Sequence, residues 1–369
     1  MNDVWSSSYE PIIDGHVHMG SIDTEPLILD VCEAAGIDQM NLVSIQDEAS
    51  GSGLPQSLYM KAMHPHQFYV FAGLNHAEKL TEGEVPTPSL VEQVDQFVAM
   101  GCDGIKMIEG KPTARQMLDI PMDAPYYEDY WARVEELQLP VVWHVNDPEE
   151  FWDPEKIPDW AKQRNWGYGP EDVGSEQLYA EVDNVLARYP DLQVIFAHFY
   201  FLSADLERAA RFFDAHPSVH FDLTPGIEML HNLSVDVGAS RDFFLTYADR
   251  IVFGTDISSR NTLEEARIRA GLVYRWLETD DAYPVPEAAD FLLGGPEDGL
   301  IQGMALPEET LEGIYRKNFI RLTGPVPNSL NVVEAVSTCE RIAAIAEAMS
   351  SMPADETEAG RVADRLAML

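Results

Sequence analysis

Basic residues are scarce in this chain of 369 residues, which holds 24 Lys and Arg against 63 Asp and Glu and carries a formal net charge of −39. An electrostatic field of that sign repels phosphate backbones and anionic lipid surfaces. We therefore expect neither nucleic acid nor a membrane among the partners of this protein. The partner that we expect instead is a small-molecule substrate, which this charge balance does not argue against.

Cysteines and long apolar runs are also rare. The three cysteines, Cys32, Cys102 and Cys339, lie far apart and form no Cys-x-x-Cys pair, which argues against a disulfide framework and a thiolate metal site. No apolar run reaches the roughly 18 residues that a membrane span needs, and the polar start Met1–Glu10 lacks the features of a secretory signal. The sequence therefore predicts a soluble, cytoplasmic protein.

What the sequence does contain is a repeated alternation of strand-like and helix-like segments. Short runs rich in branched apolar residues end in polar residues or glycine, and stretches with apolar positions at helical spacing follow them. The eight predicted strands are Ile12–His18, Met40–Ile45, Phe68–Leu74, Gly104–Ile108, Pro140–Val145, Val194–Phe199, Val219–Leu223 and Arg250–Asp256. The clearest predicted helices are Leu90–Met100, Tyr126–Leu137, Ser175–Tyr189, Ala204–His216 and Pro307–Leu322.

Eight such units predict an α/β fold of the (β/α)8 or TIM-barrel class, in which active-site groups come from the C-terminal ends of the strands. A doubly wound open sheet is the alternative. It requires a glycine-rich phosphate turn after the first strand, and the sequence HVHMG at 16–20 is not such a turn. We place one barrel domain at 11–322 and a C-terminal extension of one or two amphipathic helices at 323–369.

Two connections between the predicted elements are unusually long. Asn146–Gly174 is rich in aromatic residues, among them Trp152 and Trp166, and loops on the catalytic face of a barrel carry specificity. We expect this segment to form a lid or pocket wall in which both tryptophans contact substrate, and a packed surface flap is the alternative. The second connection, Glu278–Leu306, contains glycines and prolines that mark turns.

Histidines stand at the ends of several predicted strands. His16 and His18 lie two residues apart, so the period-two geometry of a strand points both imidazoles to the barrel interior. His144, His198 and Asp256 end the fifth, sixth and eighth strands. Imidazole and carboxylate groups at one rim suit Zn²⁺, and also Mn²⁺, Fe²⁺ or Co²⁺. The sequence therefore predicts a divalent-metal site, with Zn²⁺ as the expected ion.

The same residues give the chain a resemblance to a known family. In chain order, the strand-end set is DGHVH at 14–18, His144, His198 and GTD at 254–256. This set resembles the amidohydrolase superfamily, and most closely its amidohydrolase-related branch, which includes decarboxylases of the aminocarboxymuconate-semialdehyde and resorcylate type. Three further stretches are similar to that branch: GCDGIK at 101–106, YPDLQVIFAH at 189–198 and IYRKN at 314–318.

The resemblance implies roles for the residues at the strand ends. It implies that His16, His18, His144 and Asp256 bind one divalent metal ion, and that one ion is present rather than two. It also implies that His198 stays off the metal and polarises or protonates the substrate. Asp256 would accept a proton from the water that the metal ionises, a proton transfer that a carboxylate beside a divalent cation can perform.

Three further polar residues have roles that the sequence leaves open. Some decarboxylases of the branch carry a metal-binding glutamate where this chain has the shorter Asp14, which we expect to support the ligands without binding the metal. Lys106 stands where binuclear members carry a carboxylated lysine bridging two metals, in which case His198 becomes a ligand. Otherwise Lys106 binds a substrate carboxylate or pairs with Glu109. Arg260 is a second candidate for binding an anion, or a surface residue.

The leading functional hypothesis is a metal-dependent hydrolase of a small molecule with an amide, ester or lactone bond. Non-oxidative decarboxylation of an aromatic or unsaturated carboxylic acid is the alternative, and hydration of an unsaturated acid is a third. A barrel that binds a metal without turnover is a hypothesis of another class, but such a protein needs no proton-transfer group like His198. The family resemblance also implies a homodimer.

Overall fold

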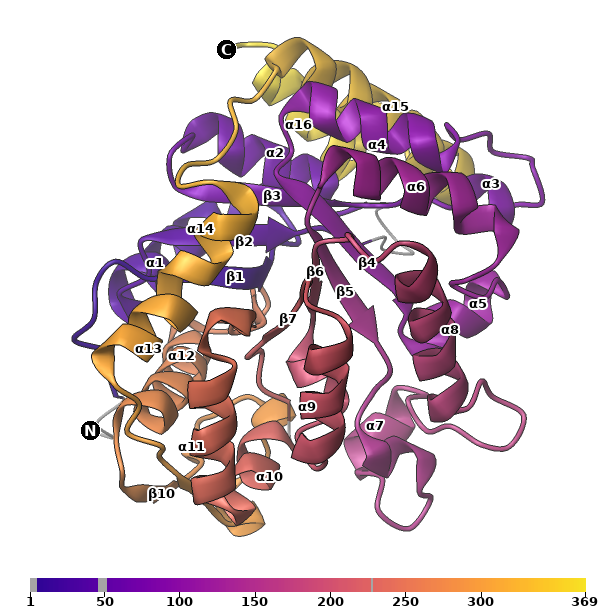
Figure 1. Cartoon of the computed structure of the whole chain (residues 1–369). Helices are drawn as coiled ribbons and strands as arrows, with labels where there is room; N and C mark the ends of the chain where they lie inside the picture. Colours follow the sequence, from indigo (N-terminus) through magenta and orange to yellow (C-terminus); the bar gives the residue numbers. More distant parts are fainter. Residues whose placement is uncertain (1–4, 46–51, 227) are drawn as a thin grey trace.

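The computed structural model describes residues 5–45, 52–226 and 228–369. Its main sheet has nine strands in the order β8-β7-β6-β5-β4-β3-β2-β1-β9, and every neighbouring pair is parallel. Helices lie around the outside of this curved sheet (Figure 1). The strands are β1 (Ile13–His18), β2 (Gln39–Val43), β3 (Phe68–Gly73), β4 (Gly104–Gly110), β5 (Val141–Val145), β6 (Val194–Phe196), β7 (Val219–Asp222), β8 (Ile251–Val252) and β9 (Ile257–Ser258).

The eighth strand of the barrel is broken into two short pieces. β8 pairs with β7, whereas β9 pairs with β1. Between the two pieces, the carbonyl of Phe253 accepts a hydrogen bond from the backbone N–H of Gly15 at 2.9 Å. The first and last strands of the row thus belong to one continuous segment, and the sheet curls back on itself as in a TIM barrel. This confirms the predicted (β/α)8 class.

All eight predicted strands are present, but five of them end earlier than predicted, and in two of these the difference moves a predicted site residue out of the strand. β6 ends at Phe196, and the four residues of the turn 198–201 all have positive φ, between 53° and 57°. Asp256, with φ 59°, lies in a turn between β8 and β9. Left-handed backbone does not fit a strand. The prediction that His198 and Asp256 end strands is therefore wrong, because both stand in turns just beyond regular strand.

The predicted helices are also present, with small shifts at their ends. α4 begins at a capping box formed by Ser89 and Glu92 and ends at Gly101, which adopts the left-handed conformation at φ 87°. The helices are α1 (Glu25–Ala35), α2 (Leu54–Met63), α3 (Ala77–Leu80), α4 (Leu90–Met100), α5 (Pro112–Leu118), α6 (Glu128–Leu137), α7 (Asp159–Gln163), α8 (Ser175–Arg188), α9 (Leu206–Ala215), α10 (Met229–Val235), α11 (Val237–Thr246), α12 (Leu263–Glu278), α13 (Glu308–Glu312), α14 (Asn318–Thr323), α15 (Val332–Ser350) and α16 (Glu358–Leu366).

Two of the apolar clusters among the described residues hold the strands of the barrel in place. The larger cluster lies between the sheet and the helices and includes the buried side chains of Trp131, Trp143 and Trp276. A smaller cluster joins residues from six of the strands with Phe319 of α14: Ile13, Val43, Tyr69, Phe71, Val142, Ile195 and Val252. Close packing of this kind fixes strand positions, and so the groups beyond them.

The two long connections and the C-terminal tail form additional layers. The segment 146–174 contains α7, and the segment 278–306 contains an antiparallel hairpin of β10 (Ala282–Pro284) and β11 (Leu300–Gln302). α15 and α16 pack against each other and against α2, with α15 also contacting α4 (Figure 1). Among the described residues, no helix is both long and apolar enough to cross a membrane.

Candidate metal centre

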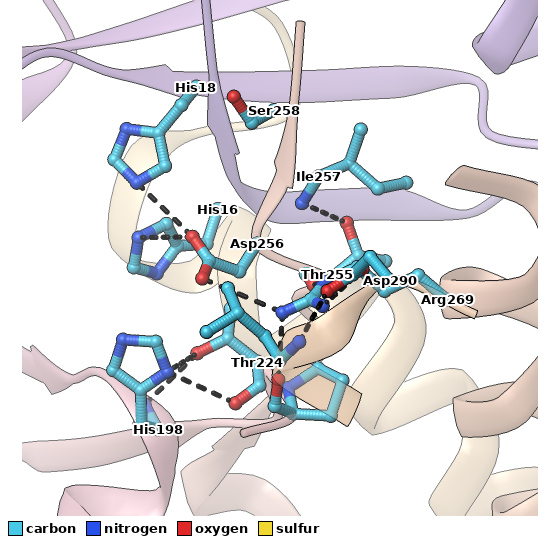
Figure 2. A network of polar contacts seen from close by, with 12 residues as sticks. His16, His18, His198, Thr224, Thr255, Asp256, Ile257, Ser258, Arg269 and Asp290 are labelled. Carbon is cyan, nitrogen blue, oxygen red and sulfur yellow. Dashed lines mark hydrogen bonds and ion pairs between the residues drawn. The ribbon is translucent and has the colours of Figure 1, made fainter. Parts of the chain in front are cut away.

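Two histidines of β1 and one aspartate of the turn between β8 and β9 form a compact donor group. One nitrogen each of His16 and His18 and one carboxylate oxygen of Asp256 lie within 4.8 Å of one another. Nε2 of His18 is 3.2 Å from Oδ1 of Asp256, and Nε2 of His16 is 3.9 Å from the same oxygen. Figure 2 shows the carboxylate of Asp256 between the two imidazoles and a buried arginine. We call these three residues the metal trio.

His16 is oriented by a carboxylate that the sequence analysis did not single out. Nδ1 of His16 donates to Oδ2 of Asp222 at 2.8 Å, which leaves its Nε2 lone pair facing the trio. Asp222, at the end of β7, also accepts from the backbone N–H of His198 and the hydroxyl of Thr224 at Oδ1. Burial alone would raise the pKa of Asp222, but His16 lowers it to about 2. A carboxylate behind an imidazole is a common support for a metal ligand.

Lys106 approaches the trio from β4. Its Nζ is 3.0 Å from Nε2 of His16, and the side chain is almost fully buried. Burial lowers the pKa of Lys106 to about 8, so its neutral form is accessible. Lys106 was a candidate to pair with Glu109. Among the described residues, Lys106 instead contacts His16, and Oε1 of Glu109 binds His76 at 2.7 Å.

His198 stands beside the trio on the left-handed turn. Nδ1 of His198 lies 3.2 Å from the carbonyl of Thr224, and its ring centroid is 5.8 Å from that of His16. With Nδ1 donating to that carbonyl, Nε2 has no hydrogen-bond partner among the described residues and can accept a proton or a hydrogen bond. Burial lowers the pKa of His198 to about 3, so the ring is neutral at pH 7. Phe201, at the end of the same turn, stacks on it at 5.2 Å.

His144 is near this group but is not part of it. Its ring centroid lies 4.8 Å from that of His198, while its Nε2 is 3.0 Å from the carbonyl of Asn146 and 3.4 Å from Oδ1 of Asp147. The structure therefore brings together three of the four predicted ligands. The assignment of His144 as the fourth ligand stays a prediction, which requires its other nitrogen or a rotated ring.

Asp14 supports the site from behind. The strand register shifts between Asp14 and Val17, which interrupts the alternation that would place Asp14 on the same face as His16. Oδ2 of Asp14 accepts from the Thr255 hydroxyl at 2.6 Å, and Oδ1 accepts from the backbone N–H groups of His16 and Thr255 at 3.1 Å each. Asp14 thus ties β1 to the turn that carries Asp256.

Arg269 of α12 holds the other side of Asp256 (Figure 2). Nε of Arg269 donates to the carbonyl of Thr255 at 2.5 Å, and its two terminal nitrogens donate to Asp290 and to the carbonyl of Pro225 at 2.8 Å each. One of these nitrogens also lies 3.7 Å from Oδ2 of Asp256. This single guanidinium therefore joins the trio, the turn after β7 and the insertion 278–306.

Two adjoining hollows open beside the trio, and both are lined by Asp256, Arg269 and Trp166. The larger hollow, of about 600 Å³, is also lined by His18, Arg164 and Arg260. The smaller hollow, of about 100 Å³, is also lined by His144, His198, Phe201, Lys111 and Gly226. Two members of the trio, His18 and Asp256, therefore line the cleft that these hollows form.

The predicted substrate-binding residues differ in their positions. Trp166 and Arg260 line the cleft, as predicted for pocket residues, whereas the Trp152 ring packs on Tyr168 at 4.6 Å and lines neither hollow. The flap around α7 touches the other insertion, because Trp160 meets Phe291 at 5.2 Å and Arg164 lies over the same ring. Contact of any of these residues with substrate stays a prediction.

Sequence reasoning missed Asp222 and Arg269 for different reasons. Asp222 is the last residue but one of the predicted strand Val219–Leu223, so a search for polar residues near strand ends could have selected it. Arg269 lies inside a helix and gives no strand-end signal. Its role depends on tertiary structure alone, because it joins segments far apart in the sequence, at Pro225 and Asp290.

The chain matches a family model described as Amidohydrolase over residues 86–324, which is more than half of its length. The chain therefore belongs to the amidohydrolase family. The match includes His144, His198 and Asp256 and begins beyond the histidine pair of β1. No curated protein matches the chain.

Solved structures share this fold at low sequence identity. A TIM-barrel protein from Bordetella bronchiseptica is 14% identical, with a TM-score of 0.51 over 85% of this chain and 98% of that chain. 2,6-Dihydroxybenzoate decarboxylase from Rhizobium is 15% identical, with a TM-score of 0.50 over 85% and 99%. 4-Oxalomesaconate hydratase from Rhodopseudomonas palustris is 12% identical, with a TM-score of 0.50 over 85% and 96%. These similarities support the barrel architecture and leave the reaction open.

Proposed function

We propose that this member of the amidohydrolase family is a metal-dependent hydrolase that acts on a small, carboxylated molecule. The observation that carries the proposal is the metal trio, in which His16, His18 and Asp256 offer two imidazole nitrogens and one carboxylate oxygen within 4.8 Å. Zn²⁺ as the ion, a single ion per site, a homodimer and a cytoplasmic location remain predictions.

The chemistry of the trio fits a divalent cation. Neutral imidazole and carboxylate are donors that Zn²⁺ and its neighbours in the first transition series accept, and a fourth position beyond three protein ligands would be left for water or substrate. Asp222 fixes which nitrogen of His16 faces the trio. When bound, such an ion would polarise a carbonyl group and acidify water. Lys106 would have to lose its proton or turn away, because its ammonium would repel the ion.

The titratable groups beside the trio favour accepting a proton from water. Burial lowers the pKa of His198 to about 3, so this ring is neutral at pH 7. Burial would raise the pKa of Asp256, but the hydrogen bond and the charge of His18 hold it well below its usual value. Both groups are therefore unprotonated at pH 7, but pKa values this low make them weak bases unless a bound ion acidifies the water. Because neither group holds a proton to give, hydrolysis is favoured over reactions that begin by protonating the substrate.

A carboxylate on the substrate would explain two cations at the mouth of the cleft. Arg164 and Arg260 line the larger hollow, and among the described residues neither guanidinium has a carboxylate partner within 4.0 Å. In a chain with 63 acidic and 24 basic residues, two arginines at one cleft without a carboxylate partner among the described residues are unexpected by composition. An anionic group of the substrate would supply the missing partner.

Non-oxidative decarboxylation, or hydration of an unsaturated acid, is the second candidate. Its support is the same arginine pair, together with the fold shared with a decarboxylase of 2,6-dihydroxybenzoate and a hydratase of 4-oxalomesaconate, both of which act on carboxylic acids. The scaffold could hold such a substrate by its carboxylate and direct the chemistry to a neighbouring carbon.

The test is a substrate panel assayed with chelator-treated and metal-reloaded protein. The panel pairs each ester, lactone and amide with a version that lacks the carboxylate, and includes aromatic acids monitored for CO2 release. We expect metal-dependent hydrolysis, with a kcat/KM that is higher for the carboxylated member and falls about 10-fold or more in Arg260→Ala, as expected for a charge-assisted hydrogen bond. CO2 release without hydrolysis would replace the first candidate by the second. Turnover that survives complete metal removal would reject both.

A further inference from the structure

The smaller hollow beside the trio has two kinds of lining. One part is polar and belongs to the metal centre, with Asp256, His198 and Arg269 among its residues. The other part is mostly apolar and contains two prolines, one leucine and four aromatic rings. These rings are Phe151, Trp160, Trp166 and Phe201. A group held at the trio would therefore lie next to an aromatic wall.

The aromatic wall is built by two separate segments of the chain. Phe151, Trp160 and Trp166 belong to the segment 146–174, and the centroids of their rings lie 5.8–6.3 Å apart in each pair. Phe201 belongs to the turn after β6 and stacks on His198 at 5.2 Å. Trp160, Trp166 and Phe201 are only partly buried. Because aromatic rings pack favourably on one another, these partly exposed rings offer a contact surface to a further ring.

The one ion pair that lines this hollow does not call for a charged ligand. Nζ of Lys111 binds both oxygens of Asp147, at 2.5 Å and 2.7 Å, and lies 4.5 Å from the centre of the Trp166 ring. Asp147 also accepts from the hydroxyl of Tyr168 at 2.5 Å. The two arginines of the larger hollow differ in this respect, since neither has a carboxylate partner among the described residues. The smaller hollow therefore suits a neutral group, and the larger hollow suits an anion.

The size of the smaller hollow fits one ring. Its volume is about 100 Å³, and Trp166 and Leu292 line both this hollow and the larger one beside it. An apolar cavity of roughly 150 Å³ binds benzene in another protein. Because the smaller hollow is not closed, a six-membered ring can lie in it and project partly toward the larger hollow. Two fused rings would not fit.

We propose that the smaller hollow is a subsite for a single aromatic ring of the substrate, bound against Trp160, Trp166 and Phe201. The substrate class that follows rests on the proposed function. With the ring in one hollow and the carboxylate at the arginines of the other, the reacting carbonyl would lie between them at the trio. The substrate would then be an ester or amide that joins an aromatic group to a carboxylated group. A simple benzoate does not qualify, because it has no cleavable bond of this kind between ring and carboxylate.

Binding of the ring itself requires neither metal nor turnover, so the subsite can be tested apart from hydrolysis. The experiment titrates the full chain, in the presence of chelator, with benzyl alcohol and with cyclohexylmethanol, and follows binding by saturation-transfer NMR. The two probes are neutral and have the same number of carbon atoms. We expect benzyl alcohol to bind about 2- to 10-fold more tightly, the range for one favourable contact between aromatic rings.

Variants locate this preference in the smaller hollow. Trp160 and Phe201 line the smaller hollow and not the larger one. Trp160→Leu and Phe201→Leu should each lower the preference for benzyl alcohol, the double variant should remove it, and Trp160→Phe should retain part of it. Trp5→Leu is the matched control, because it makes the same replacement at an exposed tryptophan outside both hollows, and it should leave the preference intact.

Three results would overturn the proposal. These are equal affinity for the two probes, a preference that persists in the double variant, and a preference that Trp5→Leu lowers as much as Trp160→Leu does. A melting temperature and a circular dichroism spectrum show whether each variant keeps its fold, and Phe201→Leu keeps the test valid if Trp160→Leu does not fold. Hydrolysis is measured separately on the metal-loaded protein. Ring binding without hydrolysis would contradict only the proposed function, whereas hydrolysis without a preference for the ring would contradict only the subsite.

Discussion

The two sides of the barrel mouth present their histidines in different ways. On the side of β1 and β9, His16 and His18 both belong to the strand β1, whose register shifts between Asp14 and Val17, and they meet Asp256 in one donor group. On the side of β5 and β6, Nε2 of His144 faces Asn146 and Asp147, and His198 stands on a left-handed turn. The three side chains of the first side can bind one common ion. The histidines of the second side are held in place by contacts with the adjoining loops.

This difference shows where strand periodicity is sufficient to place a side chain. Two residues on one face of a strand converge whatever the loop beyond them does. A residue beyond the strand end depends on the conformation of the loop, and four consecutive left-handed residues at 198–201 are costly without support. Here the support comes from Asp222 and Thr224, which bind the backbone N–H of His198.

The largest effect is expected when the trio is broken. His16→Ala and Asp256→Ala should each lose most of the bound metal and lower kcat/KM by at least about 10³-fold, because the stabilisation supplied by the ion amounts to several kcal/mol. Elemental analysis and kinetics on purified variants provide the measurement. Full metal occupancy in both variants would contradict the ligand set.

His144→Ala is the matched variant on the other side of the mouth. With Nε2 of His144 already bound to Asn146, we expect this variant to keep more metal than His16→Ala under the same conditions. Equal loss in the two variants would show that His144 is a full ligand after all. That outcome would restore the predicted set of four and erase the difference between the two sides.

The next largest effect concerns proton transfer. His198→Ala should lower kcat by about 10²- to 10⁴-fold, the range for a lost acid–base group, while the metal content stays at that of the parent protein. The paired readouts separate chemistry from metal binding. Loss of metal together with activity would instead show that His198 is a metal ligand. A site with two ions bridged by a carboxylated Lys106 requires His198 in that role.

A smaller effect is expected from the carboxylate behind His16. Asp222→Asn should weaken metal affinity by about 10- to 100-fold without abolishing binding, since it removes an orienting contact and not a donor atom. Competition with a chelator of known affinity measures this change. The control is Asp298→Asn in an exposed turn, which should leave the metal affinity unchanged. An affinity equal to that of the parent protein would show that Asp222 does not orient His16.

The sequence predicts the regular part of this arrangement and not the turns. The order of eight strands, both histidines of β1 and the helical tail follow from periodicity and chain order. The left-handed turn at His198 and the break between β8 and β9 do not, because no glycine marks the positive φ angles there. The role of Arg269 could not be predicted from the sequence for another reason. Its hydrogen bonds are made with residues that only the folded chain brings near.

The smallest effect on the bound metal is expected in a variant that tests whether the side of β5 is structural. Asp147→Asn should destabilise the fold by roughly 3 kcal/mol at pH 7, the cost of leaving a buried partner such as Lys111 unpaired, with little change in metal content. Chemical denaturation measures the free energy of unfolding. Metal loss greater than that in Asp222→Asn would contradict the structural role.

The same variant has a pH dependence with a definite sign. Burial opposes ionisation of Asp147, but the charge of Lys111 and the hydrogen bond of His144 hold its pKa below the usual value. The stabilisation is therefore complete above the ordinary carboxyl pKa of about 4 and is lost as the pH falls below it. The stabilities of Asp147→Asn and the parent protein should converge in acid. A constant difference would contradict this assignment.

Anomalous diffraction from metal-loaded crystals tests the central claim most directly, because it locates the ion without reference to activity. We predict one peak per chain at about 2.0–2.2 Å from the donor atoms of His16, His18 and Asp256, the distances typical of nitrogen and oxygen ligands. A peak bound elsewhere, or two peaks bridged by a modified Lys106, would contradict the single-ion trio.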